Sequence, residues 1–106
     1  MSQNKLSDYR LTPKAQQDLE EHWLYGAETW SVTQADKYAD ILEQTFERLL
    51  LAPEIDQERT EFDPPVRIHI VEKHLIIYRI NDDHLSILRV LGGRQNWQSI
   101  LNAIDQ

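Results

Sequence analysis

Three runs of β-branched and aliphatic residues in the second half of the chain constrain the fold most. They cover residues 66–71, 75–80 and 85–91, and their composition is typical of β-strands. The links between them are polar and only three and four residues long. Parallel neighbours would need a crossover of about a dozen residues or more, so these strands must be antiparallel. The sequence therefore predicts a three-stranded antiparallel meander.

The first half of the chain has helical periodicity instead. A short candidate strand at 9–11 precedes Thr12 and Pro13, which are typical of a helix N-cap and first helical turn. Larger and smaller apolar residues then recur at steps of four, four and three. They are Leu19, Trp23, Ala27 and Trp30. This spacing predicts one buried helical face, with Asp18 and the neighbouring glutamates on the outward faces.

A second helix is predicted after a tight link at residues 31–33. Thr33 and Asp36 resemble a capping box, and Pro53 cannot continue a helix, so we expect the helix to end near Leu51. Its apolar residues again share one face. They are Ala35, Tyr38, Ala39, Leu42, Phe46, Leu49 and Leu50. Two helices joined so closely form a hairpin.

The remaining segments complete an α+β fold. Residues 52–65 contain three prolines and no period, which predicts a loop, and Gly92 and Gly93 precede a pattern typical of a short C-terminal helix. That pattern is Trp97, Ile100, Leu101 and Ile104. We expect one domain over 1–106, with an N-terminal strand, an α-helical hairpin, and the meander packed on the hairpin before the short C-terminal helix. Periodicity leaves the partner of the N-terminal strand open.

Composition excludes several classes of function. The chain has no cysteine, so disulfides and thiolate metal sites are excluded. It also lacks the run of about 18 apolar residues that would predict a membrane span. These features predict a cytoplasmic protein without a membrane partner. Residues 1–63 hold 6 Lys and Arg against 14 Asp and Glu, whereas 64–106 hold 5 against 4. The acidic half is either a solvated helical face or a surface for a basic partner, and it disfavours direct sequence-specific binding to nucleic acid.

No catalytic or metal-binding constellation is recognisable in the sequence. The four histidines lack the i, i+4 spacing of a helical metal pair, and the serines lack a strained glycine-rich turn. The histidines are His22, His69, His74 and His84. We therefore expect no catalytic residues, no metal and no cofactor, and a protein that acts by binding other macromolecules rather than as an enzyme.

Each of the three predicted strands carries one arginine and a fourth lies just beyond the last strand, and two interpretations of this set are open. They are Arg67, Arg79, Arg89 and Arg94. They either pair with acidic residues such as Asp82, Asp83 or those of the helices, or form a basic strip on an open sheet face near Trp97. Such a strip would contact an acidic or nucleic-acid-bound partner, because Arg and Trp are frequent interface anchors. Trp23 and Trp30, by contrast, have the spacing of core residues.

Several short stretches, taken in order, resemble the RelE/ParE toxin superfamily of bacterial type II toxin-antitoxin systems, and more closely its ParE branch. The stretches are Leu11-Thr12-Pro13-Lys14-Ala15, Asp18-Leu19-Glu20-Glu21, Leu49-Leu50 to Pro53, Val66-Arg67, Leu75-Ile76-Ile77-Tyr78-Arg79, and Ile87-Leu88-Arg89-Val90-Leu91 with Arg94. They extend over nearly the whole chain. Two positions depart from the pattern: Gly92 stands where many relatives have His, and Pro65-Val66 where Gly is usual.

The resemblance implies a toxin held inactive by a cognate ParD-like antitoxin, whose C-terminal segment wraps the hairpin and the sheet groove. The residues expected to contact the antitoxin are Trp23, Trp30, Leu42 and Arg79. For the ParE branch the resemblance implies DNA gyrase as the target, inhibited by binding. The residues expected to contact the target are Arg67, Arg89, Arg94 and Trp97.

Two alternatives to the interpretation as a gyrase inhibitor are open. The RelE branch cleaves messenger RNA on the ribosome and needs a general acid or base near the last strand, where this tail offers only Arg94. An inactive member that only binds its antitoxin, retained for transcriptional autoregulation, is the third reading. The sequence alone does not choose among the three.

Overall fold

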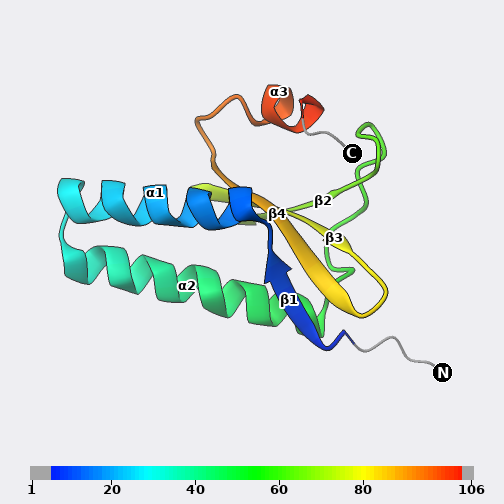
Figure 1. The fold of residues 1–106 in the computed structure, drawn as a ribbon, viewed down its shortest axis with the longest axis horizontal. Coiled ribbons are helices and arrows are strands. Elements are labelled where there is room, and N and C mark those ends of the chain that lie inside the picture. The colour runs from blue at the N-terminus through cyan, green and yellow to red at the C-terminus, as the bar shows by residue number, and fades with distance from the viewer. Residues whose placement is uncertain (1–5, 104–106) are drawn as a thin grey trace.

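The computed structural model describes residues 6–103 and confirms the predicted α+β order of elements (Figure 1). The hairpin of two long helices projects to one side of a twisted sheet, and the short last helix lies apart from the hairpin. The elements are β1 (Asp8–Leu11), α1 (Pro13–Thr29), α2 (Val32–Leu51), β2 (Arg67–Val71), β3 (His74–Ile80), β4 (His84–Gly92) and α3 (Trp97–Asn102).

The sheet has the order β1-β4-β3-β2. Strands β2, β3 and β4 form the antiparallel meander that the short links predict. Strand β1 pairs parallel with β4, with Asp8 opposite His84 at one end and Leu11 opposite Ile87 at the other. The neighbour that periodicity left open is therefore the last strand of the chain.

A β-bulge in β4 changes which residues face the hairpin. Ile77 lies opposite Arg89 but Tyr78 lies opposite Ile87, so Leu88 is an extra residue on β4. This shift allows both Ile87 and Val90, an odd and an even position, to enter the core beneath the helices. Simple alternation along β4 would have placed one of them on the other face.

Side-chain caps explain where the two helices begin. Thr12 Oγ1 accepts from the Ala15 amide at 3.1 Å, as predicted. The second cap is Ser31, whose hydroxyl accepts from the Gln34 amide at 3.1 Å. The prediction of a capping box at Thr33 is wrong, because Ser31 has the extended backbone of an N-cap and the helix has already begun at Val32.

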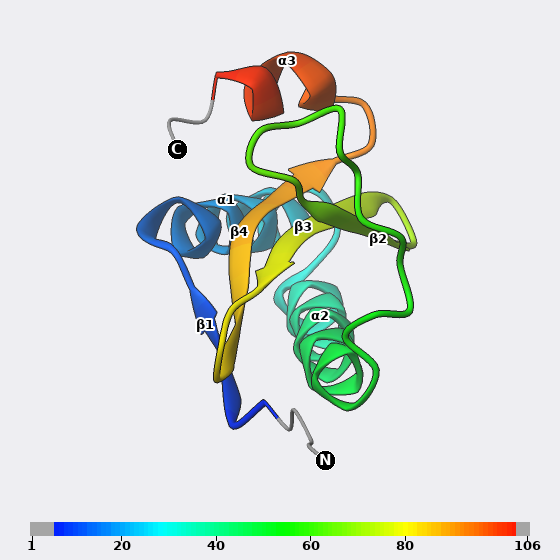
Figure 2. The ribbon, with the colours of Figure 1, turned by 90° about the vertical axis from the view of Figure 1, so that its right-hand side faces the viewer.

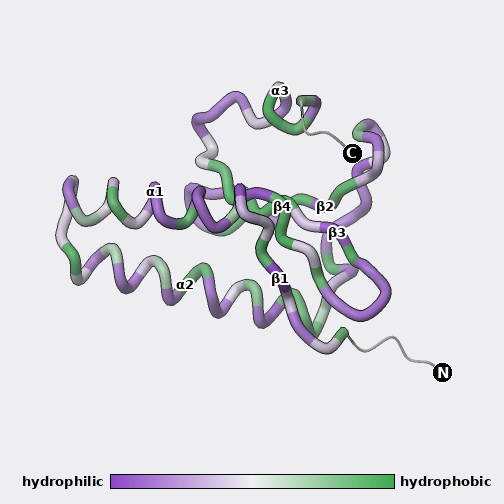
Figure 3. The backbone as a smooth tube through the Cα atoms, in the orientation of Figure 1, coloured by the Kyte–Doolittle hydropathy of each residue, from purple (hydrophilic) through white to green (hydrophobic). Residues whose placement is uncertain are grey.

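The main core lies between the hairpin and one face of the sheet, as predicted. Along both helices hydrophobic and hydrophilic residues alternate in bands (Figure 3). The buried residues of this core are Ala15, Leu42, Phe46, Leu49, Ile76, Tyr78, Leu85, Ile87 and Val90. The predicted face of α1 is wrong in part, because α1 buries Ala15 and Asp18, and Trp30 lies past the helix end with 71% of its surface exposed.

A second core lies against the opposite face of the sheet. Helix α3 and the segment between α2 and β2 close over that face at the end where β4 leaves the sheet (Figure 2). Its buried residues are Phe62, Val66, Ile77, Leu91 and Leu101. Ile104, which was also assigned to the last helix, lies outside the described residues. Within residues 6–103, no helix is long and apolar enough to cross a membrane.

Candidate binding groove

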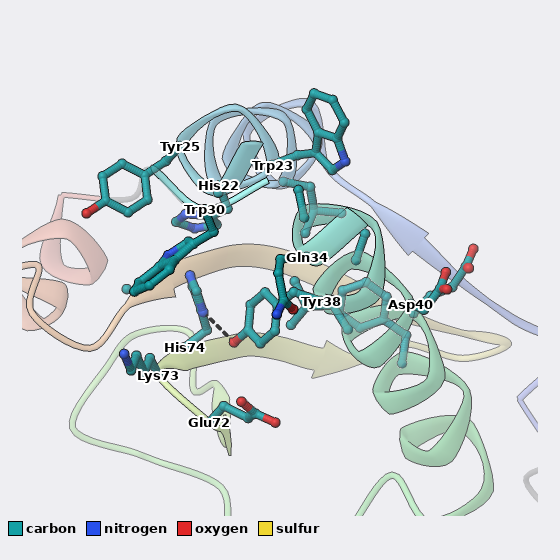
Figure 4. A pocket seen from close by; sticks show the side chains of 18 of the residues that line it. His22, Trp23, Tyr25, Trp30, Gln34, Tyr38, Asp40, Glu72, Lys73 and His74 are labelled. Atoms are coloured by element: carbon teal, nitrogen blue, oxygen red, sulfur yellow. Dashed lines mark hydrogen bonds between the residues drawn. The ribbon is translucent and has the colours of Figure 1, made fainter. Parts of the chain in front are cut away.

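A groove of about 1040 Å³ runs along the inner side of the hairpin. Its walls come from α1 and α2, and its end is formed by the β2–β3 turn and the segment that follows β4. Figure 4 shows Tyr25 and Trp30 over a Tyr38–His74 pair, with Lys73 beside that pair and Asp40 on the opposite side. Elements distant in sequence therefore converge on one hollow.

The rim of the groove is aromatic and accessible. Tyr25 is 67% and Trp30 71% exposed, whereas Leu42 is buried at 3% and contributes only to the lining. Trp23 lies on the same groove, where its indole N–H donates to Asp36 Oδ1 at 2.9 Å. Large exposed aromatic side chains beside a groove are typical of a protein-binding surface.

A cluster of three polar rings lies in the groove, and the sequence analysis missed it. Tyr38 Oη lies 2.5 Å from His74 Nδ1, and the rings of His22 and His74 are 4.2 Å apart in an edge-on arrangement. His22 Nε2 lies 2.8 Å from the Val90 carbonyl oxygen. A carbonyl can only accept, so that nitrogen carries the proton and donates. The three residues belong to α1, α2 and β3, and no local spacing brings them together.

The surroundings keep Tyr38 and His74 uncharged at neutral pH. Burial, reinforced by the neighbouring His22, lowers the pKa of His74 to about 4. Burial, reinforced by the Glu72 carboxylate, raises the pKa of Tyr38 to about 12. The pair is therefore a neutral hydrogen-bonding unit at pH 7.

Arg89 is held by helix α1 and does not face solvent as part of a basic strip. Its guanidinium donates to both carboxylate oxygens of Asp18, at 2.8 and 2.9 Å, and the Val90 amide donates to the same carboxylate at 2.9 Å. The side chains of Arg89 and Asp18 are only 16% and 9% exposed. These hydrogen bonds raise the pKa of Arg89 further above its usual range. The prediction that Asp18 lies on an outward face is wrong.

Of the other three arginines, Arg67 and Arg79 lie together, away from Arg94. Arg67 donates to the Asp56 carbonyl oxygen at 2.5 Å and Arg79 to the Pro65 carbonyl oxygen at 3.3 Å. Both line a smaller hollow of about 210 Å³. The predicted single strip on an open sheet face is therefore wrong, since the second core covers part of that face and only Arg94 lies at the groove.

Trp97 begins α3 and belongs to the second core. Its ring lies 6.4 Å from the ring of Phe62, and the Arg59 guanidinium lies 5.7 Å above it. Of the residues predicted to contact an antitoxin, Trp23, Trp30 and Leu42 line the groove and Arg79 does not. Of those predicted to contact a target, only Arg94 lines it.

Comparison with known proteins identifies the family. Residues 9–97 match the family described as the ParE toxin of the type II toxin-antitoxin system, parDE. The chain belongs to the ParE toxin family. Toxin ParE1 of Caulobacter vibrioides is 31% identical over 91 residues, which are 86% of this chain and 94% of that protein. Toxin ParE1 of Mycobacterium tuberculosis is 32% identical over 91 residues, which are 85% of this chain and 93% of that protein.

The fold of this ParE family member is also that of a solved structure. A chain from the chromosomal ParDE TA system of P. aeruginosa superposes with a TM-score of 0.73 at 20% identity, over 85% of this chain and 98% of that chain. The part that matches the family model, residues 9–97, includes both helices of the hairpin and nearly all of the sheet. The family assignment thus covers the elements that build the groove.

The groove of this ParE-family protein is lined by aromatic, polar and charged groups. In the part of the chain that the structure describes, no three His, Cys, Asp or Glu side chains lie together in a way that could hold a metal ion. The groove combines exposed aromatic rings, neutral hydrogen-bonding groups and a few charges. This combination suits a peptide segment with apolar and polar residues.

Proposed function

We propose that this ParE-family toxin is neutralised by a cognate ParD-like antitoxin, one segment of which occupies the groove, and that the free toxin inhibits DNA gyrase by binding. The observation that carries the antitoxin part is the exposed rim of Tyr25 and Trp30 beside a hollow lined by both helices. A solved relative from a ParDE system shares the fold and so supports a partner of the same kind. This function places the protein in the cytoplasm.

The groove fits the way in which a segment of a partner commonly binds between secondary-structure elements. An amphipathic segment would bury Trp30 and Tyr25, and such large aromatic rings supply much of the affinity at an interface. Leu42 would form the floor under the segment without changing its own exposure. Trp23 is already hydrogen-bonded to Asp36, so it would form part of the groove wall in a fixed position.

Gyrase as target is supported by membership in the ParE family, and Arg94 is the first residue to test. It is exposed and lies at the groove, whereas Arg89 is paired with Asp18. Arg67 and Trp97 already pack against their own chain, so they would contribute to a target surface as parts of rigid elements.

One observation favours a RelE-like ribonuclease as the second candidate. Tyr38, His74 and Arg94 line the same groove, and Tyr, His and Arg are residue types that general acid-base chemistry on RNA can use. However, the pKa of His74 is about 4, which makes it a weak base at pH 7. Inhibition by binding therefore ranks first.

The decisive experiment is induction of the chain alone in bacteria. Gyrase-dependent DNA breaks and messenger cleavage at ribosomes are measured in the same cells. Breaks without cleavage support the gyrase proposal. Messenger cleavage that is lost in the variants His74→Gln and Tyr38→Phe supports the ribonuclease. Unimpaired growth contradicts both gyrase inhibition and ribonuclease activity, and supports an inactive family member.

Antitoxin binding is tested with the small protein encoded by the neighbouring reading frame. Trp30→Ala should raise its dissociation constant at least tenfold, in line with a hot-spot loss of about 2 kcal/mol. Leu51→Ala is the matched control, because Leu51 is 88% exposed at the far end of α2 and lies outside the groove lining. Equal effects of the two substitutions would contradict this location of the site.

A further inference from the structure

Two cations are brought together at the sheet end of the groove by a backbone contact. The Gly93 amide donates to the Lys73 carbonyl oxygen at 2.8 Å, which holds the segment after β4 against the β2–β3 turn. A Cβ atom at position 93 would lie 3.3 Å from that same oxygen, so glycine permits this close crossing. Arg94 is the next residue after Gly93, so its backbone lies close to that of Lys73.

The Lys73–Arg94 pair is available for a ligand. Both residues are exposed, both line the groove, and neither has an ion-pair partner among residues 6–103. Two cationic residues at the same end of one groove attract a carboxylate more strongly than either residue alone. The arrangement is unusual in a chain with a net charge of -7.

The charge along the groove is uneven, which gives the site a direction. Asp40 and Glu43 of α2 also line the groove, and Asp40 lies on the opposite side from Lys73 (Figure 4). Glu72 is the only carboxylate of the lining on the β2–β3 turn itself. An acidic group of a ligand is therefore favoured near Lys73 and Arg94 and disfavoured near Asp40 and Glu43.

We propose that the Lys73–Arg94 pair binds an acidic side chain of the antitoxin segment, and that this contact sets the direction in which the segment lies across the aromatic rim. The inference rests on the proposed function of the groove and adds the chemistry of the partner. Beside the cations, Tyr38 and His74 present neutral polar atoms, so they do not compete for the carboxylate.

The test measures the dissociation constant of the antitoxin encoded by the neighbouring reading frame at two salt concentrations. The double charge reversal Lys73→Glu with Arg94→Glu should weaken binding about 10- to 100-fold and remove most of the salt dependence. Lys14→Glu, at an exposed position of α1 outside the groove lining, is the matched control and should have little effect. Thermal unfolding of all variants checks that they fold.

A second variant tests the crossing without changing charge. Gly93→Ala should shift the backbone next to Arg94 slightly away from Lys73 and weaken binding by a smaller factor than the reversal. In addition, each acidic residue of the antitoxin is replaced by Lys in turn, and one of these replacements should restore binding to the doubly reversed toxin.

The outcomes separate the inference from the function on which it rests. If charge reversal leaves affinity and salt dependence unchanged while Trp30→Ala weakens binding, the carboxylate contact is refuted. The groove is then still supported as the antitoxin-binding site. If Trp30→Ala also has no effect, the groove itself is refuted as the antitoxin site. If no antitoxin replacement restores binding, the direct contact with an acidic side chain is refuted.

Discussion

The two faces of the sheet carry similar residue types but differ in what covers them. On the hairpin face, Trp30 stays 71% exposed at the edge of the groove. On the opposite face, Trp97 is partly buried and packs near Phe62 and the Arg59 guanidinium. Two arginines on the hairpin side differ as well, since Arg89 is fixed by Asp18 whereas Arg94 is exposed. Whether a Trp or Arg side chain is free to contact a partner therefore depends on which neighbouring elements cover it, and not on its residue type.

The largest expected effect comes from removing the clamp that joins α1 to β4 on the hairpin face. Asp18→Ala leaves the Arg89 guanidinium and the Val90 amide without their acceptor in a nearly buried site. Loss of one partner of such a pair costs about 3–5 kcal/mol, which urea unfolding would measure. In the control, Asp18→Leu with Arg89→Met should recover most of that loss, because no buried charge remains.

The comparison of the faces is sharpened most directly by two tryptophan substitutions. Trp97→Ala should lower the free energy of unfolding by about 2–3 kcal/mol, since it removes a large, partly buried ring that packs against the second core. Trp30→Ala should change it by less than about 0.5 kcal/mol, because that ring is mostly in solvent. Denaturant unfolding measures both, and a larger loss for Trp30 would reverse the assignment of roles.

The polar cluster of the groove predicts a dependence of stability on pH. The pKa of His74 is about 4 in the folded protein against 6.5 ordinarily, so unfolding takes up a proton between these values. Stability is therefore full above pH 6.5 and falls as the pH decreases toward 4, by roughly 2 kcal/mol for a partly buried ring. Unfolding of the wild type and His74→Gln at pH 7 and 4.5 measures the difference. An identical pH dependence in both would contradict the burial of this imidazole.

The smallest effect concerns the tip of the hairpin. Ser31→Ala removes the hydroxyl that caps α2 and should lower the free energy of unfolding by about 1 kcal/mol. Thr33→Ala should change it by less than about 0.5 kcal/mol, because the Thr33 side chain is exposed and the helix has already begun. Thermal unfolding distinguishes the two variants. A larger loss of stability for Thr33→Ala than for Ser31→Ala would support Thr33 as the N-cap.

Local rules predicted most of the fold. The short links between the late strands determined the meander, and Pro53 determined the end of α2 near Leu51. The parallel pairing of β1 with β4 and the bulge at Leu88 were not predictable, because both depend on contacts between distant segments. Asp18 was misplaced for the same reason, since its partner lies 71 residues away.

The groove was predictable only in part. Trp23, Trp30 and Leu42 were assigned to an antitoxin-binding surface through the family resemblance, and they line one hollow, although their role is still a proposal. The His22–Tyr38–His74 cluster combines residues from three elements that no motif links. The close approach of Gly93 to Lys73 was not predictable either, because it joins two segments that are 20 residues apart.

The parallel pairing of β1 with β4 has a consequence for how the protein is made. Its strands are tied by contacts such as that of the Thr12 hydroxyl with the Leu88 carbonyl oxygen, 76 positions along the chain. Translation must therefore deliver nearly the entire polypeptide before the sheet can assemble, and such long-range pairing slows folding. Until then, the apolar faces of the two newly made helices are exposed to solvent. The emerging polypeptide is therefore most prone to aggregate in the interval before its last strand has been made.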